Sequence, residues 1–164
     1  MAEKSAARSE ITYGTGHHKT NTRHFAAIDN YFAAGELEKT LELGTCFIEQ
    51  YAESNHIRIT MTRIFITDAL LHLGRLDEAR EMSDIAIAEL ANQNEKIQYF
   101  LVAYAKAMHG KLLLEKGEDA IARKFTMQGK LLFTDFDNPK AFPWVNRMGE
   151  RILKWEKEAA STIE

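Results

Sequence analysis

The stretch LGRLDEAR, residues 73–80, lies between two apolar segments of similar length. Its glycine, Gly74, can adopt the left-handed backbone conformation that ends a helix. The acidic residues that follow suit the first turn of a second helix, because they interact favourably with its dipole. Ala79, five residues after the glycine, is small enough for the two helices to approach closely. The stretch therefore predicts the turn of a helical hairpin.

Similar stretches follow two other glycines. GELEKT begins at Gly35 and GEDAIA begins at Gly117, as GRLDEA begins at Gly74. The first interval is 39 residues and the second is 43 residues. A helical hairpin that recurs at such a period is typical of a solenoid.

Apolar residues recur at helical spacing on both sides of each glycine. Both prolines, Pro139 and Pro143, lie near the end of the chain, so none interrupts the helices before them. The one short candidate strand, IRIT at 57–60, continues into a longer helical pattern. We predict an all-α chain with helices over about 22–34, 36–53, 56–73, 76–91, 95–115 and 118–133, and a last helix that ends near 159.

The pattern resembles the tetratricopeptide repeat (TPR) family. In that family a glycine ends the first helix of each unit, and alanines follow five and twelve residues later. The middle unit here matches best, with Gly74, Ala79 and Ala86. The resemblance covers about residues 25–135 and implies a TPR-like superhelix of about three helical hairpins, closed by a C-terminal capping helix.

The other two units depart from the motif. Gly129 replaces the second alanine of the third unit, and Thr40 and Phe47 replace both alanines of the first. The units are also longer than the roughly 34 residues usual for the family. An unrelated bundle of six or seven helices with fortuitous glycines is the alternative.

The length of 164 residues suits one domain. We expect a flexible, polar N-terminal arm at 1–20 and a single TPR-like domain at 21–160. The net charge of −3 argues against nucleic acid as a partner, because phosphate binding needs a basic surface. No signal peptide or membrane-spanning apolar run is found, and the lone Cys46 cannot form an internal disulfide. We predict a cytoplasmic protein with no membrane contact.

No catalytic or cofactor motif of the GxSxG, HExxH or Walker type is present. The densest histidine cluster, His17, His18 and His24, has no cysteine or carboxylate at ligand spacing. Cys46 stands beside Phe47 on a predicted packed helix and is interpreted as a small core residue. We predict that the protein is not an enzyme and needs no cofactor or metal ion.

Two further groups of residues leave alternatives open. His72 and His109 are either a pH-sensitive pair across units or ordinary interhelical histidines with satisfied hydrogen bonds. Arg147, Arg151 and Lys154 recur at helical spacing in the last helix. They are either a contact for nucleic acid or an acidic peptide, or part of a solvated face.

In the family that the chain resembles, the first helix of each pair lines a concave surface. Counted from each glycine, that surface is an apolar strip with a few charges: Phe25, Asp29, Phe32, Met61, Ile64, Asp68, Leu71, Tyr104, Met108 and Lys111. Such a composition suits an extended or helical peptide. The alternative is a core strip, covered by the N-terminal arm, the last helix or a second subunit.

The resemblance therefore implies a non-enzymatic interaction module, such as an adaptor, chaperone or regulator, that binds a partner protein or peptide through this groove. One alternative is a regulatory protein that senses a small molecule or peptide and acts on transcription through a partner. Another is a homo-oligomeric structural element, for example a homodimer whose groove is its own interface. The sequence does not identify the partner, the pathway or the oligomeric state.

Overall fold

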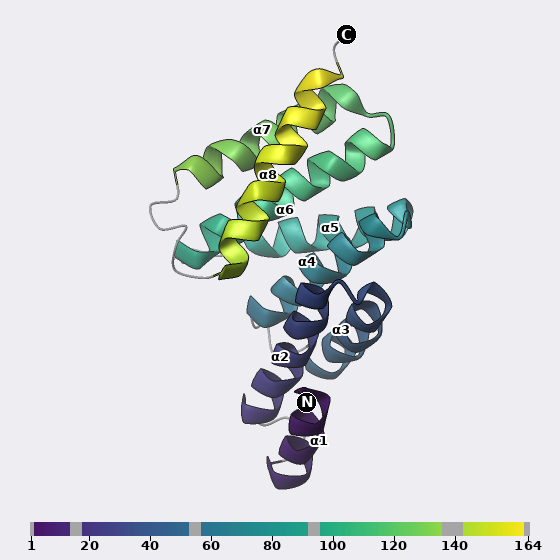
Figure 1. The fold of residues 1–164 in the computed structure, drawn as a ribbon, viewed down its shortest axis with the longest axis vertical. Helices are drawn as coiled ribbons and strands as arrows, with labels where there is room; N and C mark the ends of the chain where they lie inside the picture. Colours follow the sequence, from purple (N-terminus) through teal and green to yellow (C-terminus); the bar gives the residue numbers. More distant parts are fainter. Residues whose placement is uncertain (1, 14–17, 53–56, 92–95, 136–142, 163–164) are drawn as a thin grey trace. The chain divides into compact units, whose positions relative to one another are not determined.

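The computed structural model describes residues 2–13, 18–52, 57–91, 96–135 and 143–162. These residues form eight helices and no strand (Figure 1). The helices are α1 Ala2–Tyr13, α2 His18–Ala34, α3 Leu37–Tyr51, α4 Ile57–His72, α5 Leu76–Ala91, α6 Lys96–Glu115, α7 Asp119–Thr134 and α8 Pro143–Ser161. The all-α prediction is confirmed, and α2 to α8 lie where the apolar spacing placed helices.

The chain divides into two compact units, residues 1–75 with α1 to α4 and residues 76–164 with α5 to α8. Each unit has its own buried side chains. Phe47 and Phe65 are among those of the first unit, and Phe100 and Leu112 are among those of the second. That residues 21–160 act as a single domain stays a prediction.

The repeated glycines form the turns of the hairpins. Gly35, Gly74 and Gly117 have φ angles of 75°, 73° and 76°, a conformation that side chains with a Cβ rarely adopt. After Gly74, the backbone N–H of Arg75 donates to the carbonyl of Leu70 at 2.9 Å, which satisfies one of the last acceptors of α4. Each following helix begins two residues after the glycine, within one residue of the predicted start.

Helices α6 and α7 approach closely because two glycines face the opposite backbone. A Cβ on Gly129 would lie 2.7 Å from the carbonyl oxygen of Ala103, and one on Gly110 would lie 2.8 Å from that of Ala122. The departure from the repeat motif at Gly129 therefore has a structural reason. An alanine there would not fit at this helix separation.

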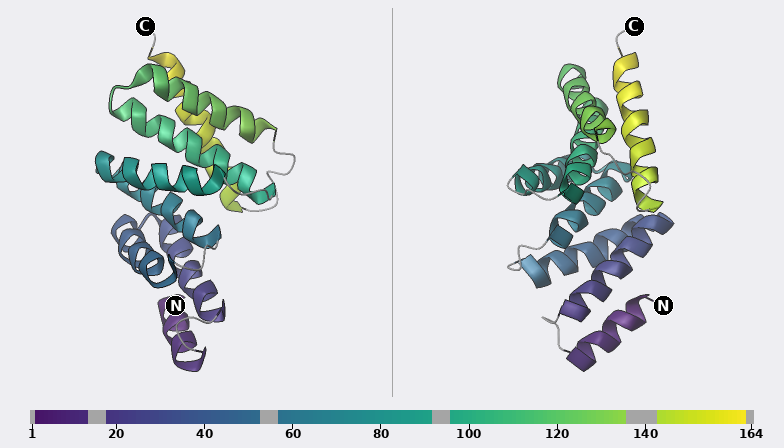
Figure 2. Two further views of the ribbon diagram at one scale, coloured as in Figure 1. Left: turned by 180° about the vertical axis from the view of Figure 1, so that it is seen from behind. Right: turned by 90° about the vertical axis from the view of Figure 1, so that its left-hand side faces the viewer.

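Helix α8 packs against both α6 and α7 (Figure 2). The ring of Trp155 lies 5.5 Å from that of Tyr104, and Lys130 Nζ lies 2.9 Å from Glu156 Oε2. The predicted C-terminal capping helix is confirmed. Its other tryptophan, Trp144, has a side chain outside the described part of the structure.

Helix α1 occupies most of the segment for which we expected a flexible arm. It packs against α2 with Ala6 buried, and Arg23 of α2 donates a hydrogen bond to the carbonyl of Ser5 at 3.3 Å. The contact between α1 and α2 is made through the small residue Ala6, and the segment has few large apolar residues. A sequence argument based on apolar stripes therefore missed this helix.

Candidate functional site

The residues predicted to line a groove differ in their exposure. Four of them are buried, with 1% or less of their surface exposed: Ile64, Asp68, Tyr104 and Met108. The other six are half-buried: Phe25, Asp29, Phe32, Met61, Leu71 and Lys111. Only these six present side-chain surface that a partner could contact without rearrangement.

In the first unit, the structure brings two of the predicted residues together on a third aromatic ring. Phe32 stacks on Phe65 of α4 with ring centroids 4.4 Å apart, and Phe25 stacks on the same ring at 6.0 Å. Phe65 was not among the predicted site residues, although it lies beside Ile64 in the sequence. The aromatic part of the strip therefore belongs to the α2–α4 contact and remains half-exposed on the α2 side.

In the second unit, α8 covers part of the strip. Arg151 donates a hydrogen bond to the Tyr104 hydroxyl at 3.1 Å, and Lys111 Nζ lies 2.8 Å from Glu158 Oε2. Burial alone would lower the pKa of Lys111, but its bonds to Glu115 and Glu158 outweigh this effect and raise it. Tyr104 and Lys111 therefore take part in the contact between α6 and α8.

The basic residues of α8 do not form one solvated row. Arg151 is half-buried and reaches Tyr104, whereas Lys154 is exposed and lies 3.8 Å from Glu158. The Arg147 side chain lies outside the described residues. Arg151 therefore contributes to the packing of α8.

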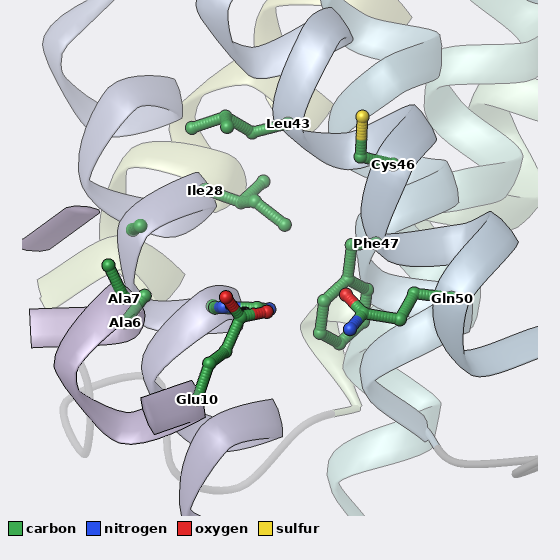
Figure 3. Close-up of a pocket in the computed structure, with 10 residues that line it drawn as sticks. Ala6, Ala7, Glu10, Ile28, Leu43, Cys46, Phe47 and Gln50 are labelled. Atoms are coloured by element: carbon green, nitrogen blue, oxygen red, sulfur yellow. Dashed lines mark ion pairs between the residues drawn. The ribbon is translucent and has the colours of Figure 1, made fainter. Parts of the chain in front are cut away.

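A cavity of about 360 Å³ lies in the first unit, between α1, α2 and α3 (Figure 3). Most of its wall is apolar, with contributions from Ala7, Ala27, Ile28, Leu43 and Phe47. Figure 3 shows the Glu10 carboxylate and the Gln50 amide directed into the space between the helices. The sequence analysis did not predict this cavity, because it depends on the position of α1.

A chain of hydrogen bonds joins the three helices at this cavity. His24 of α2 has its Nε2 atom 3.3 Å from Glu10 Oε1 of α1, and its Nδ1 atom 3.3 Å from the Tyr51 hydroxyl of α3. Burial, together with the negative charge of Glu10, raises the pKa of Tyr51. Glu10 is the one carboxylate among the described residues that line the cavity.

The interpretation of Cys46 as a core residue is wrong. The thiol is exposed, and Cys46 lines the cavity. Phe47 occupies the inward position of α3 with 2% of its surface exposed. A neighbouring residue on a helix is rotated by about 100°, so Cys46 points in a different direction from Phe47.

The structure gives His72 a hydrogen-bond partner within its own helix and His109 a partner on another helix, α5. His72 Nδ1 lies 2.8 Å from the carbonyl oxygen of Asp68, and His109 Nδ1 lies 3.0 Å from the Ser83 hydroxyl. Burial lowers the pKa of His109, although the nearby Asp84 carboxylate opposes the effect. Within the described residues, no group of three or more His, Cys, Asp or Glu side chains is placed to hold a metal ion. Of the histidine cluster, His17 and the side chain of His18 lie outside the described part of the structure.

The chain was compared with known proteins at the level of sequence and of structure. No protein-family model matches the sequence, and no curated protein matches it. Its structure is similar to the crystal structure of nearly identical TPR-like repeats assigned to a kinesin light chain of Podosopora anserina. The two share 15% sequence identity with a TM-score of 0.67, over 98% of this chain and 79% of that chain. The chain therefore has a TPR-like helical repeat fold, as its glycine-bounded hairpins predicted. No helix in the described part of the chain is both long and apolar enough to span a membrane.

Proposed function

We propose that this protein is a non-enzymatic protein–protein interaction module that acts in the cytoplasm as an adaptor, chaperone or regulator. The observation that carries the proposal is the TPR-like repeat fold, because folds of this kind commonly bind protein partners. Stacked helical hairpins present long surfaces that suit extended or helical peptides.

The arrangement of the cavity favours binding over catalysis. Cys46 and His24 line the same space, a combination that can serve nucleophilic catalysis when the histidine acts as a base. Here both ring nitrogens of His24 are engaged, one with Glu10 and the other with Tyr51. His24 could accept a proton from the thiol only by giving up one of these contacts.

We place the partner contact on the half-buried part of the predicted strip in the first unit. Phe25, Asp29 and Phe32 follow one another at helical spacing on α2, and Met61 and Leu71 are half-buried on α4. Apolar side chains with an adaptable methionine suit a helical or extended segment of another protein.

The test is capture of a partner from an extract of the native host by the full-length tagged chain. Mass spectrometry identifies what is eluted, and light scattering gives its stoichiometry. We expect a foreign protein in stoichiometric amount. An eluted sample that contains this chain alone, with the mass of two chains, would instead favour the homodimer alternative.

Two matched variants locate the surface. Met61→Glu, on the proposed surface, is expected to weaken capture about tenfold, the effect of losing one well-packed contact. Met127→Glu, on the exposed face of α7 in the second unit, makes the same change outside that surface and should leave capture unchanged. Circular dichroism checks that both variants keep their helix content. Equal capture by both variants would contradict the proposed surface.

A further inference from the structure

The cavity between α1, α2 and α3 combines an apolar wall with a carboxylate. Its volume of about 360 Å³ is near the lower end of the roughly 300–1,000 Å³ that ligand pockets span. A cavity of this size suits one side chain or a small molecule. Ala27, Ile28 and Phe47 supply wall surface for a hydrocarbon chain, and Glu10 supplies a charge.

The charge around the cavity is negative. The Glu10 side chain is 35% exposed, and one of its carboxylate oxygens lies 3.3 Å from His24 Nε2. On α3, the exposed Glu42 and Glu49 lie about one turn to either side of Cys46, and Lys39 pairs with Glu42 at 2.8 Å. An anionic ligand would be repelled here, and a purely apolar one would cover the Glu10 charge without compensating it.

The described basic side chains of α1 and α2 are directed away from Glu10. Lys4 and Arg8 of α1 are exposed and lie about 120° or more around the helix from Glu10. On α2, Arg23 reaches the carbonyl of Ser5. The Glu10 carboxylate is therefore directed into the cavity without a lysine or arginine beside it on α1.

We propose that this cavity binds a lysine side chain of the partner protein, with its methylene stem against the apolar wall and its ammonium group against Glu10. The inference rests on the proposed function, since the lysine belongs to the partner. Lysine fits better than arginine because one oxygen of Glu10 already accepts from His24. A guanidinium group binds a carboxylate best through both oxygens, whereas an ammonium group acts as a point charge on a flexible stem.

The probe that tests the site directly is the pentapeptide acetyl-Ala-Ala-Lys-Ala-Ala-amide. Its control has norleucine in place of lysine, which keeps the methylene stem and removes the charge. Both are titrated into the full-length protein at millimolar concentration while backbone amide signals are followed by NMR. We expect the lysine peptide to shift the signals of Ala6, Ala7, Cys46 and Gln50, and to bind about fivefold more tightly than the norleucine peptide.

Two protein variants assign the preference to Glu10. Glu10→Gln should lose the roughly fivefold preference for lysine and still bind the norleucine peptide as before. Glu81→Gln removes an exposed carboxylate of α5 and should keep the preference. Equal or tighter binding of the norleucine peptide, or shifts confined to other helices, would overturn the inference.

The outcome separates this inference from the proposed function. If a partner is captured and Glu10→Gln captures it equally well, the lysine site is wrong and the interaction function stands. If the lysine peptide binds the cavity with the stated preference and no protein is captured, the lysine chemistry stands and the proposed interaction function falls.

Discussion

The two units of the chain use the same hairpin with different packing. In the second unit, Gly110 and Gly129 bring the backbones of α6 and α7 together, and α8 covers Tyr104. In the first unit, the close approach at Gly44 is to side chains of Ile66 and Thr62, and a cavity remains between α1, α2 and α3. Side chains can move, whereas a backbone contact cannot without shifting a helix. From this comparison we expect the first unit to adapt its packing more easily than the second unit.

The largest expected effect is the loss of the α8 contact. Trp155→Ala removes a ring that is 5% exposed and packs on Tyr104, so we expect the free energy of unfolding of the second unit to fall by about 4 kcal/mol. Urea unfolding followed by circular dichroism measures it. A loss below about 1 kcal/mol, the size expected for a surface substitution, would show that α8 does not stabilise this unit.

The next prediction compares the two kinds of close approach. Gly129→Ala places a Cβ against the backbone of α6 and should cost about 3 kcal/mol. Gly44→Ala places a Cβ 2.9 Å from Ile66 Cγ1, a side-chain atom that can move, and should cost about 1 kcal/mol.

Both tryptophans lie in residues 76–164, so tryptophan fluorescence reports on the second unit, while circular dichroism reports on both. Gly129→Ala should lower the urea midpoint of the fluorescence signal, and Gly44→Ala should leave it nearly unchanged. If the two substitutions cost the same, the proposed difference in rigidity between the units is wrong.

The terminal helices extend the comparison. Helix α1 packs on α2 through the buried Ala6, the hydrogen bond from Arg23 to Ser5 and the contact of Glu10 with His24. Helix α8 buries four apolar side chains: Met148, Ile152, Trp155 and Ala159. We expect amide hydrogen exchange in α1 to be at least about tenfold faster than in the central turns of α8. Equal protection of the two helices would contradict the view that α1 is the more easily displaced.

The smallest expected effect is a dependence of stability on pH in the second unit. His109 is the only histidine in residues 76–164, and burial lowers its pKa from 6.5. The unfolded chain then binds a proton more readily than the folded one, so stability is highest above the unfolded pKa. The free energy of unfolding decreases as the pH drops below about 6.5, and the contribution of His109 to this decrease is complete below its pKa in the folded state.

Urea midpoints from tryptophan fluorescence between about pH 8 and 5.5 measure this dependence. His109→Gln keeps a polar side chain near Ser83 and should flatten the profile. An unchanged profile in this variant would assign the dependence to other groups.

Local rules were sufficient for the helices and their turns. Gly35, Gly74 and Gly117 were assigned as turns because a helix end depends on a few neighbouring residues, and all three have the positive φ that the assignment requires. The apolar spacing also placed α2 to α8 to within a few residues. It could not place α1, since its packing depends on alanines that any surface helix could carry.

The sequence by itself determined the repeated hairpin, because backbone conformation and helical spacing are properties of adjacent residues. Only the tertiary structure decided which face of each helix is covered and by what. The repeat pattern predicted one strip for Tyr104, Lys111, Phe25 and Phe32. In the second unit, the first two are in contact with α8, whereas in the first unit Phe25 and Phe32 pack on Phe65 and stay half-exposed. Likewise, Cys46 and Glu10 meet at one cavity only because α1 returns to α2 and α3. Such contacts join residues far apart in the chain, and helical spacing carries no information about them.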